Sequence, residues 1–208
     1  MASRFQNRHR VLEEVAGLVV DRPFEQLSMN GIAEACGVSL WALRYNFDNV
    51  DRLFRAVAHH LIEKVLDQAR CPLAVSPVVV DTIADHARFV ADLVRRPDYR
   101  DLLYLVVRNG RHHEWLRSAY EQRVVGRICA DLEQRIRQSG ETHGLNILLR
   151  EHAAQRFHRR IETELVLTTL LPSPVEREPV DLDKLLKEIV RETFEATYAF
   201  EWGTATAA

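Results

Sequence analysis

The side chains best suited to chemistry lie between Ser28 and Asn49, where polar, aromatic and basic residues alternate with apolar ones. An arginine in such a segment could contact a phosphate, or donate two hydrogen bonds to the O6 and N7 atoms of guanine. Serine and asparagine could contact phosphates or cap helices. The pattern suits contact with double-stranded DNA, and it suits a helical hairpin without DNA contact equally well. With the basic N-terminus included, the candidates are Arg4, Arg8, Ser28, Asn30, Ser39, Leu40, Trp41, Arg44, Tyr45, Asn46 and Asn49.

A second group of candidates lies between Tyr99 and Tyr120, where aromatic rings alternate with hydrogen-bonding groups that could line a pocket for a small organic ligand. For each aromatic residue, packing in the core is the alternative. Arg108 stands on an otherwise apolar helix, and a buried arginine there would need an anionic partner. That partner could be Glu121, Asp101 or a ligand carboxylate. The candidates for ligand contact are Tyr104, Arg108, His112, Trp115 and Tyr120.

The sequence gives less support to catalysis or to metal binding. It shows no nucleophile–base pair, no pair of carboxylates at a catalytic spacing and no phosphate-binding glycine loop, so we expect no enzyme and no cofactor. His112, His113 and Glu114 are adjacent, and adjacent residues point in different directions around a helix. His158 and Glu162 share a face but supply only two ligands. We therefore expect no metal site.

Helices must position the candidate residues, because the apolar residues recur at a spacing of three to four and no period-two strand is visible. A first helix is predicted over residues 8–20. A short second helix follows Ser28, and a third of about seven residues follows Ser39, each serine serving as the N-cap. On the third helix we expect Leu43 and Phe47 to lie in the core. The residues expected to be exposed there are Ser39, Leu40, Trp41, Arg44, Tyr45 and Asn46. Gly37 between them suits a left-handed turn. A fourth helix is predicted from Asn49 to Arg70.

The remainder of the chain repeats the pattern of amphipathic helices. Arg96-Pro97, Gly110, Ser139-Gly140 and Pro172 mark the ends of four of them. A segment with three prolines, residues 172–180, is predicted to be an extended linker. The predicted helices cover about residues 80–94, 99–109, 114–138, 145–171 and 182–200.

Composition sets outer bounds on the function. The chain has 208 residues, of which 47% are hydrophobic and 28% charged, with a formal net charge of −2. No apolar run approaches the roughly 20 residues of a membrane span, and the basic N-terminus is not followed by the apolar region of a secretory signal. Three well-separated cysteines suit a reducing compartment. We expect a cytoplasmic protein without a membrane partner.

The segment from Phe24 to Val57 resembles the DNA-binding segment of TetR-family transcriptional regulators. The resemblance implies an all-α fold, with a helix-turn-helix domain of three helices over residues 1–50 and a helical ligand-binding and dimerisation domain over residues 51–208. It also implies a homodimer that is formed through the two C-terminal helices and represses transcription at a palindromic operator. A ligand would act by moving the fourth helix. The matching residues are Ser28, Ile32, Ala33, Ala35, Gly37, Val38, Ser39, Leu43, Phe47, Leu53 and Phe54.

The departures from the family pattern concern mainly the residues that would face DNA. The family usually has glycine or proline at Trp41, tyrosine at Arg44, histidine or tyrosine at Asn46, and lysine at Val50. Asn30 and Pro23 also depart from it. We therefore expect DNA binding with an atypical operator preference. The alternative is a TetR-like small-molecule-binding protein whose DNA binding is weak or lost.

Overall fold

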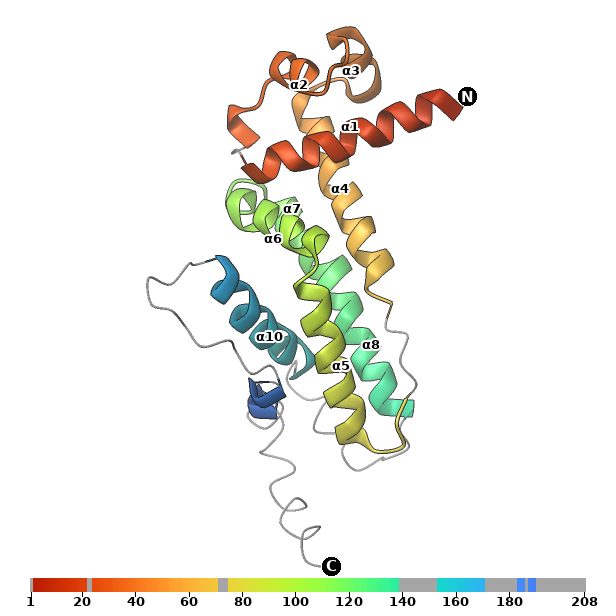
Figure 1. The fold of residues 1–208 in the computed structure, drawn as a ribbon, viewed down its shortest axis with the longest axis vertical. Coiled ribbons are helices and arrows are strands. Elements are labelled where there is room, and N and C mark those ends of the chain that lie inside the picture. Colours follow the sequence, from red (N-terminus) through yellow and green to blue (C-terminus); the bar gives the residue numbers. More distant parts are fainter. Residues whose placement is uncertain are drawn as a thin grey trace, which may run out of the picture. The chain divides into compact units, whose positions relative to one another are not determined.

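In the computed structural model, the described residues are 2–21, 24–70, 75–138, 153–170, 183–185 and 187–189. Helices make up most of this part of the chain, and no strand occurs in it (Figure 1), which confirms the predicted all-α class. The chain divides into two compact units, one formed by Met1–Gln68 with Pro97–Val124 and the other by Ala69–Arg96 with Val125–Ala208. The predicted boundary at residue 50 divides the chain by function, and it stays a prediction.

The first unit consists of α1 (Ala2–Asp21), a 3₁₀ turn (Phe24–Gln26), α2 (Met29–Ala35), α3 (Leu40–Phe47), α4 (Val50–Gln68), α6 (Pro97–Asn109) and α7 (Glu114–Ala119). Helix α4 packs against both α1 and α6, and α3 packs against α2 and α4. Apolar side chains at a spacing of three to four explain this packing, because they put one face of each helix into a common core. That core includes Val15, Val19, Leu53, Phe54, Val57, Leu61 and Leu102.

The second unit contains α5 (Val79–Val94), α8 (Gly126–Gln138) and α10 (Ala153–Leu170), and each packs against the other two. Ile83, Leu132 and Phe157 are among the residues of its core. Two histidines, His86 and His158, are buried in the same unit. Burial disfavours the charged imidazolium, with the charges of His86 and Arg159 acting in the same direction, and lowers the pKa of His158 to about 3.

Several predicted helix limits were wrong. Helix α1 starts at Ala2 and not at residue 8, because alanine, arginine and glutamine extend a helix without any need for apolar periodicity. Pro97 begins α6, a position that suits proline because the first helical N–H needs no partner. The predicted helix 114–138 contains a π-helical turn, Tyr120–Val125, between α7 and α8. Residues 145–152, the linker 172–180 and most of the predicted helix 182–200 lie outside the described residues.

None of the helices in the described part of the chain is long and apolar enough to cross a membrane.

Substitution of Gly37 tests the turn between α2 and α3, with Gly17 as the control. Gly37 has a φ of +62° and Gly17 lies inside α1, and a Cβ added at either would meet no atom within 4 Å. We expect Gly37→Ala to destabilise the fold by about 1–2 kcal/mol, because a side chain disfavours the left-handed conformation. Gly17→Ala should instead stabilise it by about 0.5–1 kcal/mol, because alanine favours a helix interior. Urea unfolding measures both, and equal effects would contradict the left-handed turn.

Candidate nucleic-acid interface

Helices α2 and α3 form a helix-turn-helix whose two N-termini are capped as predicted. The Ser28 Oγ atom accepts a hydrogen bond from the Gly31 N–H, and the Ser39 Oγ atom accepts one from the Ala42 N–H, both at 3.1 Å. Gly37 takes the left-handed conformation, and the Val38 N–H donates to the Ala33 carbonyl oxygen at 3.0 Å. These contacts satisfy backbone groups that a helix end leaves without partners, so the turn is locally specified.

One side of the helix-turn-helix is buried and holds α3 in place. Leu43 and Phe47 of α3 are buried, as predicted, and so are Ile32 and Ala33 of α2. Because these residues fill the core, α3 presents its opposite side to solvent.

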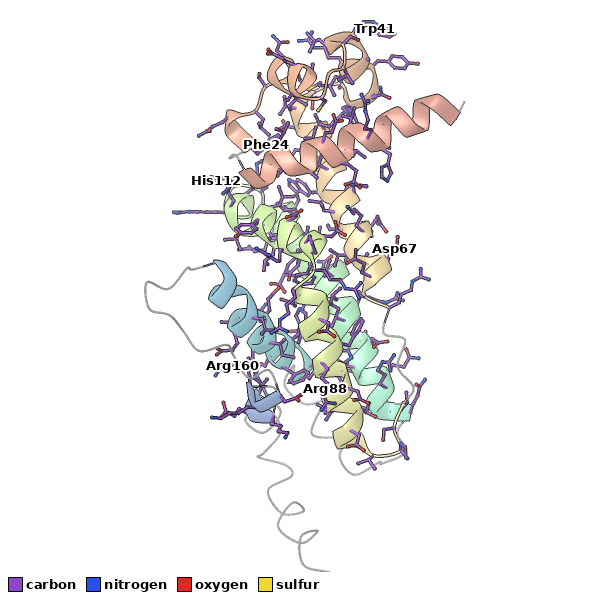
Figure 2. All side chains as sticks on the ribbon, in the orientation of Figure 1. Phe24, Trp41, Asp67, Arg88, His112 and Arg160 are labelled. Atoms are coloured by element: carbon purple, nitrogen blue, oxygen red, sulfur yellow. The ribbon has the colours of Figure 1, made fainter. Side chains whose placement is uncertain are left out.

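The outer side of α3 carries an aromatic pair. Trp41 is 74% exposed and Tyr45 is 59% exposed. Their rings stack on each other, with centroids 5.3 Å apart and an interplanar angle of 11°. Trp41 therefore packs on its neighbour one helical turn away. Figure 2 shows Trp41 at the outer edge of the helix-turn-helix and not in the core. Large apolar side chains are rarely exposed together on a monomer surface without a partner, so this side of α3 has the character of a contact surface.

Two of the candidates on α3 are less exposed than expected. Leu40 and Asn46 are half-buried. The Asn46 Nδ2 atom donates a hydrogen bond to the Ala42 carbonyl oxygen at 2.7 Å, so its amide faces the preceding turn of its own helix. Ser39 and Arg44 are exposed, in line with the prediction, and so are Ser28 and Asn30.

The N-terminus of α4 lies beside the end of α3. The Asn49 Oδ1 atom accepts a hydrogen bond from the Arg52 N–H at 2.9 Å, which makes Asn49 the cap of α4. A shallow hollow of ≈ 530 Å³ lies here, lined by Met29, Arg44, Asp48, Asn49, Val50 and Asp51. Backbone N–H groups at a helix N-terminus favour an anion. The lining also includes two carboxylates, Asp48 and Asp51, and one guanidinium, Arg44. The negative charges of the carboxylates disfavour the binding of a phosphate.

The acidic character of this hollow is a feature that sequence reasoning missed, although Asp48 and Asp51 are visible in the sequence. The Asp48 carboxylate forms an exposed ion pair with the Arg52 guanidinium at 3.4 Å. Asp51 stands in the first turn of α4, where the helix dipole favours a negative charge. Val50 is half-buried between them and supplies no charge.

Arg8 of α1 is exposed and lies close to α3. Its guanidinium carbon is 5.3 Å from the centroid of the Phe47 ring, a distance that suits a cation–π contact. The side chain of Arg4 lies outside the described residues.

Comparison with known proteins adds to this geometry. No protein-family model and no curated protein matches the chain. Solved structures do match: a TetR-family transcriptional regulator from Mesorhizobium loti has a TM-score of 0.65 and 14% identity, with 93% of this chain and 97% of that chain covered. The chain has the fold of TetR-family transcriptional regulators.

Two further structures share the TetR fold with this chain. A transcriptional regulator from Streptomyces coelicolor has a TM-score of 0.59 and 20% identity, covering 90% of this chain and 98% of that one. AibR in complex with isovaleryl coenzyme A and operator DNA has a TM-score of 0.57 and the same identity and coverage. In all three matches the TetR fold extends over nearly the whole chain and beyond the helix-turn-helix.

The five ligand candidates have different surroundings within the TetR-like fold. Tyr120 is buried, with its Oη atom 2.8 Å from the Oη atom of Tyr99. Trp115 is half-buried beneath Arg55, whose guanidinium carbon is 4.4 Å from the ring centroid. The other three are half-buried Tyr104, exposed Arg108 and exposed His112, which Figure 2 labels. Arg108 falls on the solvent side of α6, so it does not have the burial that would require an anionic partner.

Proposed function

We propose that this protein is a ligand-responsive transcriptional regulator that binds double-stranded DNA. The observation that carries the proposal is the exposed side of α3, where Trp41, Arg44 and Tyr45 project from a helix-turn-helix with both N-termini capped. In such units the second helix enters the major groove. The arginine can pair with guanine, and the stacked rings can contact sugars and thymine methyl groups.

The charges around α3 argue for modest electrostatic affinity. Arg8 and Arg44 are available for phosphates, but Asp48 and Asp51 stand at the edge of the same surface. Each phosphate contact contributes roughly one unit to the dependence of affinity on salt concentration. We therefore expect a shallow salt dependence, with specificity carried by base contacts.

We further propose that the protein acts in the cytoplasm as a homodimer and represses transcription at a palindromic operator. A two-fold axis would place two copies of α3 in successive major grooves. The dimer would form through the two C-terminal helices, of which the second lies mostly outside the described residues. The fold shared with AibR supports a small organic ligand as effector, and Tyr104, Arg108, His112, Trp115 and Tyr120 are the candidates for its contacts. The effector would favour the conformation that cannot bind DNA.

One observation favours a second candidate function, a small-molecule-binding protein with weak or lost DNA binding. Asp48 and Asp51 flank the N-terminus of α4, and the neutral Val50 stands between them. Asp48 is paired with Arg52, so Asp51 is the carboxylate that opposes a phosphate here, at a place where the family usually presents lysine. The two candidates differ in one measurable property, affinity for DNA.

A gel-shift experiment separates the two functions. Purified protein is titrated at low salt against DNA fragments from the region upstream of its own gene, with a scrambled fragment of equal length as the control. A shift confined to a palindromic fragment supports the regulator. Equal affinity for all fragments, or no shift at low salt, would exclude sequence-specific regulation and leave the second candidate.

Arg44→Ala tests the recognition surface directly. We expect affinity for the operator to fall by about 10–100-fold, which corresponds to the roughly 1–3 kcal/mol of a bidentate contact with guanine. The loss should be smaller on operators changed at the base pair that Arg44 contacts. Fluorescence anisotropy with labelled duplexes measures both effects.

The matched control for Arg44→Ala is Arg95→Ala, because Arg95 is also exposed but follows the end of α5. It should leave operator affinity within about twofold. If Arg44→Ala behaves like this control, Arg44 has no part in reading DNA.

A further inference from the structure

Three potential metal ligands lie close together between α1 and α4, and none of them belongs to α3. His9 and Glu13 come from α1 and His60 from α4, all within the first compact unit. One donor atom from each, two imidazole nitrogens and one carboxylate oxygen, lies within 4.8 Å of the other two. His9 is exposed, whereas the His60 side chain is only 11% exposed. The cluster is thus reachable from solvent on the His9 side and enclosed on the His60 side.

The three donors lie near one another, but not all at the spacing that a tetrahedral ion requires. His9 and Glu13 stand four residues apart on one helix and so share a face. The His60 Nε2 and Glu13 Oε1 atoms are 2.9 Å apart, and the two imidazole rings meet edge to face with centroids 4.9 Å apart. Ligands at about 2.0–2.2 Å from a tetrahedral ion are roughly 3.3 Å from one another. Rotation of the exposed His9 side chain can bring its ring nitrogen closer to the other two donor atoms.

A second layer of contacts holds the Glu13 carboxylate in position. Its Oε2 atom accepts a hydrogen bond from Lys64 Nζ at 3.1 Å, and the Lys64 ammonium pairs with Asp98 Oδ1 at 2.7 Å. Asp98 Oδ2 accepts a further hydrogen bond from Gln68 Nε2 at 2.6 Å. Such outer contacts orient metal ligands and raise affinity.

The charge balance at the cluster also suits a cation. Burial disfavours ionisation of Glu13, but hydrogen bonds from His60 and Lys64 outweigh it and hold the pKa of Glu13 below its usual value. Two carboxylates, Glu13 and Asp98, face one ammonium, Lys64, so the neighbourhood carries one net negative charge when both histidines are neutral. The positive charge of Lys64 is already balanced and does not exclude a divalent ion.

From these contacts we propose that His9, Glu13 and His60 form a binding site for Zn²⁺, with water as the fourth ligand on the solvent side. Two imidazoles and one carboxylate are a ligand set that zinc takes in open sites. Binding replaces the hydrogen bond between His60 and Glu13 by two metal–ligand bonds and releases any proton held on the coordinating nitrogen. The site goes beyond the proposed function, because it does not depend on DNA or on an organic effector.

A bound ion would join α1 to α4 and so stabilise the unit that carries α2 and α3. Anything that binds the folded state alone raises the free energy of unfolding by RT ln(1 + L/Kd), where L is the free ligand concentration. Zn²⁺ should therefore raise the melting temperature of the protein, and a chelator should reverse the rise.

Titration of the full-length protein with Co²⁺, a spectroscopic substitute for Zn²⁺, tests the site. We expect visible d–d absorption at the intensity of a four-coordinate ion, saturating at one ion per chain and abolished by excess Zn²⁺. His9→Ala should weaken Co²⁺ binding by at least about 100-fold, since loss of even an outer-shell partner costs roughly 10–100-fold. Because His9 is exposed, this variant should keep the helical circular dichroism of the wild type.

Two further variants complete the experiment. Glu13→Gln keeps the shape of the side chain but removes the anionic ligand, and it should also abolish the absorption. The matched control is His59→Ala, which removes an exposed imidazole next to His60 that contacts Arg123 and not the cluster. It should bind Co²⁺ like the wild type. Wild-type protein without the absorption, or a His9→Ala variant with unchanged affinity, would overturn the proposal.

Discussion

Phe54→Ala should lower the free energy of unfolding by roughly 3–5 kcal/mol, the usual cost of removing a fully buried phenylalanine ring. Phe54 is 1% exposed and lies at the centre of an aromatic cluster. Its ring stacks on Phe24 at 3.9 Å between centroids and meets the edge of Trp115 at 5.7 Å, with His113 at 5.0 Å. The substitution removes these contacts and leaves a cavity that the surrounding helices can only partly close.

Urea unfolding followed by circular dichroism measures this loss. Val107→Ala is the control, because Val107 also lies on a helix of the first unit but is 68% exposed. It should change the stability by no more than about 0.5 kcal/mol. A Phe54→Ala variant that loses less than about 1 kcal/mol would mean that the cluster around α4 is not packed in solution.

The second large effect is a dependence of stability on pH that originates at His158. Its folded-state pKa of about 3 lies well below the ordinary histidine value of 6.5. Between these two values the unfolded chain binds a proton that the folded chain does not. The contribution of His158 is therefore fully present above pH 6.5 and is lost as pH falls. We expect a loss of about 2 kcal/mol between pH 7 and pH 5 from this residue alone.

The His158 effect can be separated from that of the carboxylates by its pH range. Burial opposes the ionisation of Glu13, Asp98 and Asp131, but hydrogen bonds and nearby cations hold their pKa values below the usual ones. Their contribution is lost only as pH falls through those lowered values, below about pH 4.5.

Unfolding experiments between pH 5 and pH 7 isolate the histidine. His158→Leu should remove most of the slope in this range. His112→Leu replaces an exposed histidine and should leave the slope unchanged. A wild-type protein with constant stability between pH 7 and pH 5 would show that His158 can be protonated in the folded state.

Local sequence signals predicted the helix-turn-helix well. Ser28 and Ser39 before apolar residues predicted two caps, and Gly37 predicted the left-handed turn, because each of these features depends on residues at most four positions apart. The burial of Leu43 and Phe47 followed from helical spacing in the same way. These elements, with the all-α class, are the part of the fold that short-range chemistry determines.

Other features depend on residues that only the tertiary structure brings together. Glu13 and His60 are 47 positions apart in the sequence, so no local sequence pattern could predict their contact. The half-buried position of Asn46 reflects competition between solvent and a carbonyl of its own helix, which residue type alone does not decide. The π-helical turn at Tyr120–Val125 is likewise invisible to a helical period of 3.6.

The exposure of Trp41 gives the protein a built-in optical reporter of its own recognition helix. The sequence contains three tryptophans, and Trp115 is half-buried while Trp202 lies outside the described residues. In a Trp115→Phe, Trp202→Phe variant, emission would come from a solvent-facing indole stacked on Tyr45. Bases or sugars that displace water from this ring should quench its emission and shift it to shorter wavelength. Any duplex could then be screened for contact with α3 without a label.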